Sequence, residues 1–356
     1  MLKKVFLTAS ILLTAYLGFT QDSTTAEEPK PVFSGSVDAY YRYNFQNAMD
    51  GWNSNNYTSF TNSQNSFELG MASLKVDYSG NKFGGVIDLG FGRRAQEFSY
   101  TDMTEGDDEA PTALAFVKQA YVSYSPISRL KFTAGKWATH MGYELLDPQL
   151  NRNYSMSYLF SYGPFSHTGL KADISLTDHF GLMVGIANPT DYVTASYTNK
   201  YALAQFSASF DKFSAYLNYV GGNDYDDAMN HQVGLTAIGT ISDKFSIGYD
   251  GAVKFYKPTG GDSYKWWGSA LYLNVDPCPT FGLTLRGEYF SDDDGVAGFY
   301  TSIFDATLSL NIKPVEHIMI VPEFRLDSGK DEIFTKKNMD PTKSTGTFML
   351  AAIFSF

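Results

Sequence analysis

The chain repeats a short pattern in which apolar and polar residues alternate. In segment 344–356, Phe348, Leu350 and Phe354 fall on one side of an extended chain, and Thr347 falls on the other. Because successive side chains of a β-strand point to opposite faces, this pattern predicts a strand with one strongly apolar face. The same period of two recurs in segments 33–45, 83–91, 169–176, 245–256, 281–289 and 318–327.

The connections between these segments alternate between short and long. We count sixteen candidate strands, joined by seven short turns and eight long loops. The long loops cover 46–65, 93–113, 138–164, 188–200, 221–230, 257–264, 291–299 and 328–343. This arrangement predicts an all-β fold, namely a transmembrane antiparallel up-and-down β-barrel of sixteen strands with short periplasmic turns and long extracellular loops. The alternation slips near Met71 and Ala72, where we expect a β-bulge.

The two ends of the chain predict export and membrane assembly. Lys3 and Lys4 precede an apolar run that ends at Phe19, so we interpret residues 1–20 as a signal peptide. The run is short for a transmembrane anchor, which is the alternative interpretation. Residues 21–32 then form a periplasmic lead-in and 33–356 the barrel. The terminal Phe356 resembles the signal by which outer-membrane barrels engage the barrel-assembly machinery.

Composition excludes several other functions. The net charge is −11 and becomes −13 without the signal peptide, which argues against nucleic acid as a partner. The single cysteine, Cys278, rules out an internal disulfide. Ser155, His167 and Asp147 could form a catalytic arrangement, but no nucleophile motif surrounds Ser155. We therefore expect no enzyme activity, no cofactor and no bound metal.

Several motifs resemble a known family. They are Ala-Gly-Lys-Trp at 134–137, Asn-Arg-Asn-Tyr-Ser at 151–155, Gly-Pro at 163–164 and His-Thr-Gly at 167–169. This set is similar to the OmpL-like β-barrel porins of Gram-negative bacteria. The resemblance implies passive solute passage across the outer membrane, with lipid and lipopolysaccharide around the barrel. It names no solute, and it leaves a monomer and a homo-oligomer equally open.

The face opposite the apolar one carries charges of both signs. The candidate pore-lining residues are Asp38, Arg42, Asp88, Lys171, Asp173, Asp250, Lys254, Arg286, Glu288, Glu323 and Arg325. The third long loop is the longest, and we expect it to fold into the barrel and bring Glu144, Asp147 and Arg152 toward the lumen wall. Paired charges at such a constriction can either hold the wall rigid or screen solutes by charge.

The resemblance implies a porin for small hydrophilic solutes, and the excess of acidic residues near the pore predicts a mild cation preference. Two alternatives remain. The first is an anion-selective or phosphate-selective porin that uses the basic residues of the same set. The second is a closed barrel with a structural or adhesive role.

Overall fold

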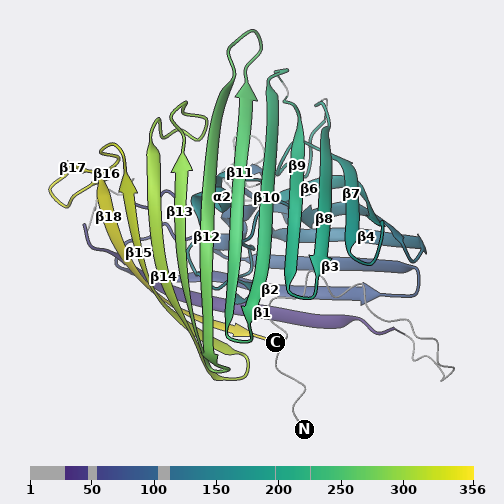
Figure 1. Cartoon of the computed structure of the whole chain (residues 1–356), viewed down its shortest axis with the longest axis horizontal. Coiled ribbons are helices and arrows are strands. Elements are labelled where there is room, and N and C mark those ends of the chain that lie inside the picture. The colour runs from purple at the N-terminus through teal and green to yellow at the C-terminus, as the bar shows by residue number, and fades with distance from the viewer. Residues whose placement is uncertain (1–28, 47–53, 103–112, 197, 225) are drawn as a thin grey trace.

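Sixteen strands form a closed antiparallel barrel in which each strand pairs with its neighbours in the chain (Figure 1). The computed structural model describes residues 29–46, 54–102, 113–196, 198–224 and 226–356. The predicted signal peptide therefore lies outside the described residues, as does most of the lead-in. The sixteen-stranded barrel predicted from the alternation is confirmed, and its long loops all emerge at one end.

The strands occupy nearly the ranges that the sequence predicts. The barrel strands are β1 (Val32–Asn44), β2 (Ser66–Ser79), β3 (Phe83–Phe91), β4 (Val117–Ile127), β5 (Leu130–Ala138), β6 (Ser166–Ser175), β7 (Phe180–Ala187), β8 (Tyr201–Phe210), β9 (Phe213–Asn223), β10 (Met229–Ser242), β11 (Phe245–Lys257), β12 (Tyr264–Cys278), β13 (Phe281–Ser291), β14 (Ser302–Val315), β15 (Ile318–Gly329) and β18 (Ser344–Ser355). The last long loop contains a small hairpin of β16 (Phe334–Thr335) and β17 (Pro341–Thr342).

The two faces of each strand differ as the alternation requires. On β13, the outward Leu285 is 41% exposed, whereas its neighbour Thr284 is fully buried inside the barrel. Strands β3, β7 and β9 each begin with a phenylalanine directly after a short turn, at Phe83, Phe180 and Phe213, and all three rings are exposed on the outer surface. Aromatic rings at this level are typical of the boundary between lipid and water.

A β-bulge interrupts strand β2 at the predicted place. The pairing of β1 with β2 shifts between Asp38 and Ala39, which face Met71 and Leu69, so Gly70 is the extra residue. The shift lets the backbone N–H of Met71 donate to the Asp38 carboxylate at 3.0 Å. The bulge therefore connects an inward carboxylate to the backbone of the neighbouring strand.

The C-terminal residue closes the barrel. The N–H of Phe356 donates to the carbonyl of Gly35 at 3.0 Å, and the N–H of Gly35 donates back to Phe356 at 3.1 Å. A Cβ atom at position 35 would lie 2.8 Å from the Phe356 ring, so only glycine leaves room for the ring there. The last residue thus extends the seam between β18 and β1.

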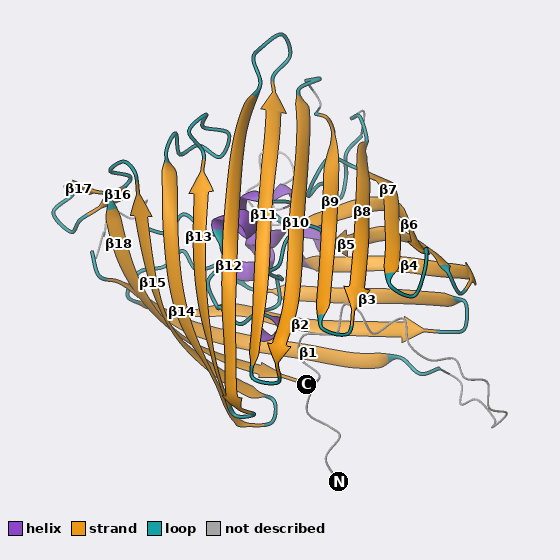
Figure 2. Ribbon diagram, viewed as in Figure 1, coloured by secondary structure: helices purple, strands orange, loops and turns teal. Residues whose placement is uncertain are grey.

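Short helices lie inside the ring of strands (Figure 2). The second long loop contains α1 (Arg93–Phe98) and the 3₁₀ turns η2 (Tyr100–Asp102) and η3 (Ala113–Phe116). The third long loop contains η4 (Pro148–Leu150) and α2 (Tyr158–Tyr162). In the part of the chain that is described, no helix is long and apolar enough to cross a membrane.

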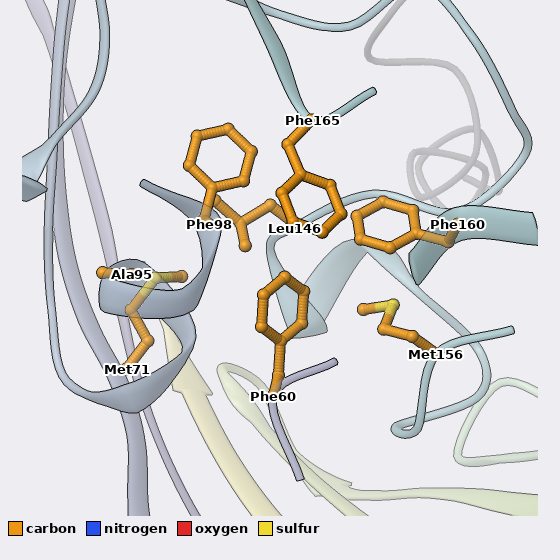
Figure 3. Packing of buried hydrophobic residues seen from close by; sticks show 8 residues of the cluster. All are labelled: Phe60, Met71, Ala95, Phe98, Leu146, Met156, Phe160 and Phe165. Carbon is orange, nitrogen blue, oxygen red and sulfur yellow. The ribbon is translucent and has the colours of Figure 1, made fainter. Parts of the chain in front are cut away.

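An apolar cluster joins the first three long loops within the barrel (Figure 3). Phe60 comes from the first long loop, Phe98 from α1, and Phe160 and Phe165 from the third loop, and their rings face one another. Phe160 and Phe165 stack with ring centres 5.4 Å apart. Met71, Ala95, Leu146 and Met156 complete the cluster. These loops therefore pack together as one unit inside the barrel, and burial of their apolar surface stabilises it.

Candidate functional site in the barrel lumen

The third long loop, residues 139–165, runs through the lumen and is called the inner loop below. Local hydrogen bonds shape it before it meets the wall. The Asn151 side chain receives the N–H of Leu145 at 2.9 Å and donates back to the carbonyl of the same residue. Ser157 caps α2 by accepting the N–H of Phe160 at 3.0 Å. Such caps satisfy backbone groups that would otherwise be buried without partners.

A chain of alternating charges fixes the inner loop to strands β13, β14 and β15. Glu144 of the loop accepts from Arg286 at 2.6 Å. Arg286 also contacts Asp305 at 3.0 Å, and Asp305 contacts Arg325 at 3.0 Å. Arg325 then pairs with Asp327 at 2.7 Å. All five side chains are buried, so every charge needs an opposite partner here, and removal of one would leave its neighbour uncompensated.

Two wall carboxylates hold the loop through its backbone. Glu288 of β13 accepts the N–H groups of Tyr158 and Leu159 at 2.8 and 2.7 Å. Glu323 of β15 accepts those of residues 154 and 155 at 2.7 and 3.0 Å. Each carboxyl group thus accepts one N–H group of the loop on each of its two oxygens, and these bonds hold the loop without an ion pair.

Asp38 and Asp250 anchor the loop on the two flanking parts of the wall. Asp38 of β1 accepts the Tyr154 hydroxyl at 2.5 Å, and Asp250 of β11 accepts the N–H of Tyr143 at 3.2 Å. The ring of Tyr143 lies against Gly248, where a Cβ atom would come within 2.4 Å of it. The missing side chain therefore allows the loop to approach β11 closely.

The predicted constriction residues Glu144, Asp147 and Arg152 all contact the wall, at three different places. Glu144 pairs with Arg286 as described, and Asp147 pairs with Lys118 of β4 at 2.5 Å. Arg152 makes two hydrogen bonds to Asp276 near the short-turn end of β12, at 2.7 and 3.0 Å. The inner loop thus reaches from the long-loop end deep toward the other end of the barrel. Whether these residues control conduction stays a prediction.

Most of the candidate pore-lining residues are buried by contacts within the protein. Eight of them are at most 5% exposed: Asp38, Arg42, Asp88, Asp250, Arg286, Glu288, Glu323 and Arg325. Three retain partial exposure. Lys171 and Asp173 form a pair at 3.4 Å on β6, with side chains 19% and 33% exposed, and Lys254 lies in a pocket at the long-loop end.

Sequence reasoning missed Arg94 and Lys118. The Arg94 guanidinium lies between the rings of Phe60 and Tyr154, 5.0 Å from each centre, and donates to the carbonyl of Leu146 at 3.2 Å. Lys118 contacts Asp88 at 3.0 Å as well as Asp147. Arg94 lies in a loop, where no periodic pattern marks it. Lys118 lies in a strand, and nothing in the alternation of that strand indicates its partners.

A cavity of about 580 Å³, called the outer pocket, opens between the loops and the wall at the long-loop end. Residues of α1, the inner loop, the 188–200 loop and strands β8 to β11 line it. Asp191 of its lining accepts the N–H groups of Phe165 and Ser166 at 2.7 and 2.8 Å and the Tyr100 hydroxyl at 3.2 Å. Burial outweighs these hydrogen bonds and raises the pKa of Asp191 to about 6.

The three residues that could form a catalytic arrangement, Ser155, His167 and Asp147, each contact other partners. Ser155 contacts Arg286 and Arg325, while His167 contacts Thr139, and Asp147 contacts Lys118. Within the described ranges, no three His, Cys, Asp or Glu side chains are grouped so that they could hold a metal ion.

Comparison with known proteins places this geometry among porins. A model of the family described as "Putative beta-barrel porin-2, OmpL-like" matches residues 32–356. No curated protein matches the sequence. Among solved structures, the outer membrane channel DcaP of Acinetobacter baumannii is similar with a TM-score of 0.62 at 12% identity, covering 93% of this chain and 99% of that one.

Two further structures share the fold. The anion-selective porin from Comamonas acidovorans has a TM-score of 0.61 at 13% identity, with 92% of this chain and 100% of that one covered. OmpT of Vibrio cholerae in its trimer form has a TM-score of 0.58 at 12% identity, with 93% and 100% covered.

Proposed function

Because the chain belongs to the OmpL-like β-barrel porin-2 family, we propose that it lets small hydrophilic solutes diffuse across the outer membrane of a Gram-negative bacterium. The family and its fold are non-enzymatic channels. The observation that carries the proposal is the inner loop, which is fixed against β11 to β15 and β1 while Lys171 and Asp173 on β6 keep part of their exposure. The proposed route follows this less occupied side of the lumen.

A mild cation preference is supported by the charges of the long loops. The last five long loops, at 188–200, 224–228, 258–263, 292–301 and 330–343, contain eleven acidic residues and five lysines. Fixed negative charge at the entrance of a narrow aqueous path raises the local cation concentration, most strongly at low salt. The excess therefore favours cations at the outer mouth.

Planar-bilayer recording of the refolded mature chain tests this function. We expect discrete conductance steps and, under a KCl gradient, a reversal potential of the sign set by K⁺, which shrinks as both salt concentrations rise. Anion preference would instead support the anion-selective or phosphate-selective alternative, in which Lys171 and Lys254 would contact the solute.

A closed structural or adhesive barrel is the second candidate. The apolar cluster of the first three long loops supports it, because a packed cluster inside the lumen leaves less room for water. Folded barrels that insert into the bilayer without any conductance would favour this candidate over a porin.

We also propose that Phe356 engages the barrel-assembly machinery. Its ring is 56% exposed at the seam, and its backbone bonds to Gly35 do not depend on the side chain. Phe356→Lys should therefore lower the amount of heat-modifiable folded band in outer membranes, because recognition of the aromatic ring is lost. Tyr300→Lys, at an exposed loop position, is the matched control. Equal folded bands for Phe356→Lys and the wild type would contradict this role.

Export and assembly complete the proposal. Residues 1–20 would be removed as a signal peptide, which mass spectrometry of the N-terminus of the membrane-embedded protein can test. Outward apolar side chains would contact lipid and lipopolysaccharide. The trimer form of the similar Vibrio cholerae OmpT supports a homo-oligomer, which cross-linking in native membranes would reveal.

A further inference from the structure

The outer pocket lies where a solute would enter the barrel from the long-loop end. Its floor is formed by inward side chains of β10 and β11, and tyrosines of the surrounding loops border it. A cavity with a few convergent polar groups and aromatic walls is the usual form of a small-molecule site. What the pocket could bind follows from the polar groups that are left without partners.

Lys254 and Gln232 stand side by side on the floor of the outer pocket. They are direct partners in the register of β10 and β11, so their side chains leave the wall on the same face as neighbours. Gln232 is only 5% exposed, yet neither its amide nor the Lys254 ammonium makes a hydrogen bond or ion pair within the described ranges. The Lys254 ammonium has only the longer-range attraction of Asp191 and Asp224. Two adjacent donors that lack a hydrogen bond favour a ligand with two acceptor oxygens, because buried polar groups are normally paired. A carboxylate fits this requirement.

Acidic and aromatic side chains form other parts of the lining. Asp224 accepts the Tyr201 hydroxyl and lies 3.5 Å from the Asn230 amide, and Asp191 has the N–H partners described above. Both aspartates attract Lys254 across the pocket, but neither forms a direct ion pair within the described residues. A ligand with several negative charges would be repelled by these aspartates, whereas a cationic group would be attracted.

The tyrosine rings provide a second reason for a cationic group. Tyr100 and Tyr192 are 54% and 46% exposed in the lining, so part of their surface is accessible to a ligand. The face of a tyrosine ring attracts an ammonium ion. A ligand with one carboxylate and one ammonium therefore matches both the donor pair and the acidic, aromatic part of the lining.

We propose that the outer pocket is a binding subsite for small zwitterions of the amino-acid type, with the carboxylate on Lys254 and Gln232 and the ammonium facing Asp224 and the tyrosines. This proposal deepens the porin function, since it names the class of solute that the entrance would retain. It concerns equilibrium binding and can therefore be tested separately from conduction.

Isothermal titration calorimetry of the folded full-length barrel in nanodiscs tests the subsite with three probes that share a phenyl ring on a short alkyl chain. These are phenylalanine, 2-phenylethylamine, which lacks the carboxylate, and 3-phenylpropionate, which lacks the ammonium. We expect phenylalanine to bind at least roughly tenfold more tightly than either of the others, because it alone makes both charged contacts. Equal binding of 3-phenylpropionate and phenylalanine, or no binding of phenylalanine, would overturn the proposal.

Matched variants assign the two ends of the ligand. Lys254→Met should weaken phenylalanine binding roughly tenfold or more without weakening the binding of 2-phenylethylamine, and Lys254→Arg should retain phenylalanine binding. Lys257→Met, on the same strand but outside the pocket, is the control, and unchanged phenylalanine binding by Lys254→Met would overturn the assignment. Asp224→Asn should weaken phenylalanine binding more than Asp226→Asn does, and equal effects would overturn the role of Asp224.

The same preparations separate this proposal from the porin function. Barrels that conduct KCl but do not bind phenylalanine would overturn the subsite alone. Barrels that bind phenylalanine but never conduct would overturn the porin function and support the subsite.

Discussion

At the scale of single residues, carboxyl groups of the lumen wall hold the inner loop by accepting its backbone N–H groups. Glu288 is nearly fully buried and receives two N–H groups from the start of α2. A buried carboxyl group without hydrogen-bond donors would be destabilising. These two bonds satisfy both partners at once. The buried acid gains donors, and the N–H groups of the first turn of α2, which have no partner within the helix, gain acceptors.

Glu288→Gln should loosen the inner loop. A glutamine keeps one acceptor oxygen but presents an NH₂ group to one of the two N–H donors, so one buried bond is lost and two donors face each other. We expect the free energy of unfolding to fall by about 1–3 kcal/mol, measured by urea titration of the folded barrel. Glu332→Gln, at an exposed position in the last long loop, is the control. Equal urea midpoints for the two variants would contradict the anchoring role of Glu288.

Asp191 should make stability depend on pH. Its pKa is raised to about 6 in the folded protein by burial, so between pH 4 and pH 6 the folded state binds more protons than the unfolded state. The contribution of Asp191 to stability is therefore greatest at low pH and is lost as pH rises through 6, by about 1 kcal/mol between pH 5 and pH 7. Urea titrations at both pH values measure this change. Asp191→Asn should lack this contribution, and a pH dependence equal to that of the wild type would exclude Asp191 as its source.

At the scale of elements, each strand separates a lipid face from a lumen face. On β8, Phe206 is 44% exposed on the outer surface beside Leu217 of β9, and Ser207 faces the lumen. Phe206→Arg should destabilise the barrel by about 2–4 kcal/mol, because the charge would lie near the bilayer midplane. Ser207→Arg should cost much less, since that side chain can reach water. Urea titrations in lipid vesicles that show the same cost for both variants would contradict this orientation.

The strands could be predicted from the sequence because their signal is local. Alternation at period two and the spacing of turns located sixteen strands, and the slip near Met71 located the bulge. The path of the inner loop has no such signal. Its anchors join residues more than a hundred positions apart, such as Tyr158 with Glu288, and the alternation indicates only that Glu288 points inward.

The same limit explains the outcome for the charged residues of the lumen. The pattern predicts which side chains face inward, but not whether they meet water or another part of the chain. Arg286 and Glu323 face the inner loop, whereas Lys171 and Asp173 are covered less completely. The outer pocket could not be predicted from the sequence either, because its lining comes from several loops and four strands.

At the scale of the whole molecule, the barrel and its inner loops form one packed structure. The closed sheet satisfies every strand edge, which a lipid environment requires. Inside it, the charge chain from Glu144 to Asp327 and the apolar cluster around Phe60 hold the inner loop from two sides. In the proposed passage the inner loop is a fixed element, so we expect the size of the passage to stay constant under voltage unless the inner loop is released.

Deletion of residues 144–152 should widen the passage. The deletion removes the Glu144, Asp147 and Arg152 contacts with Arg286, Lys118 and Asp276, so the wall there becomes exposed to water. We expect a higher single-channel conductance in planar bilayers, with a lower urea midpoint because Lys118 and Arg286 each lose an ion-pair partner. Deletion of residues 336–340, in the hairpin of the last long loop, should leave conductance unchanged. If both deletions fold and conduct like the wild type, the inner loop does not narrow the path, and solutes pass along a side of the lumen that it does not reach.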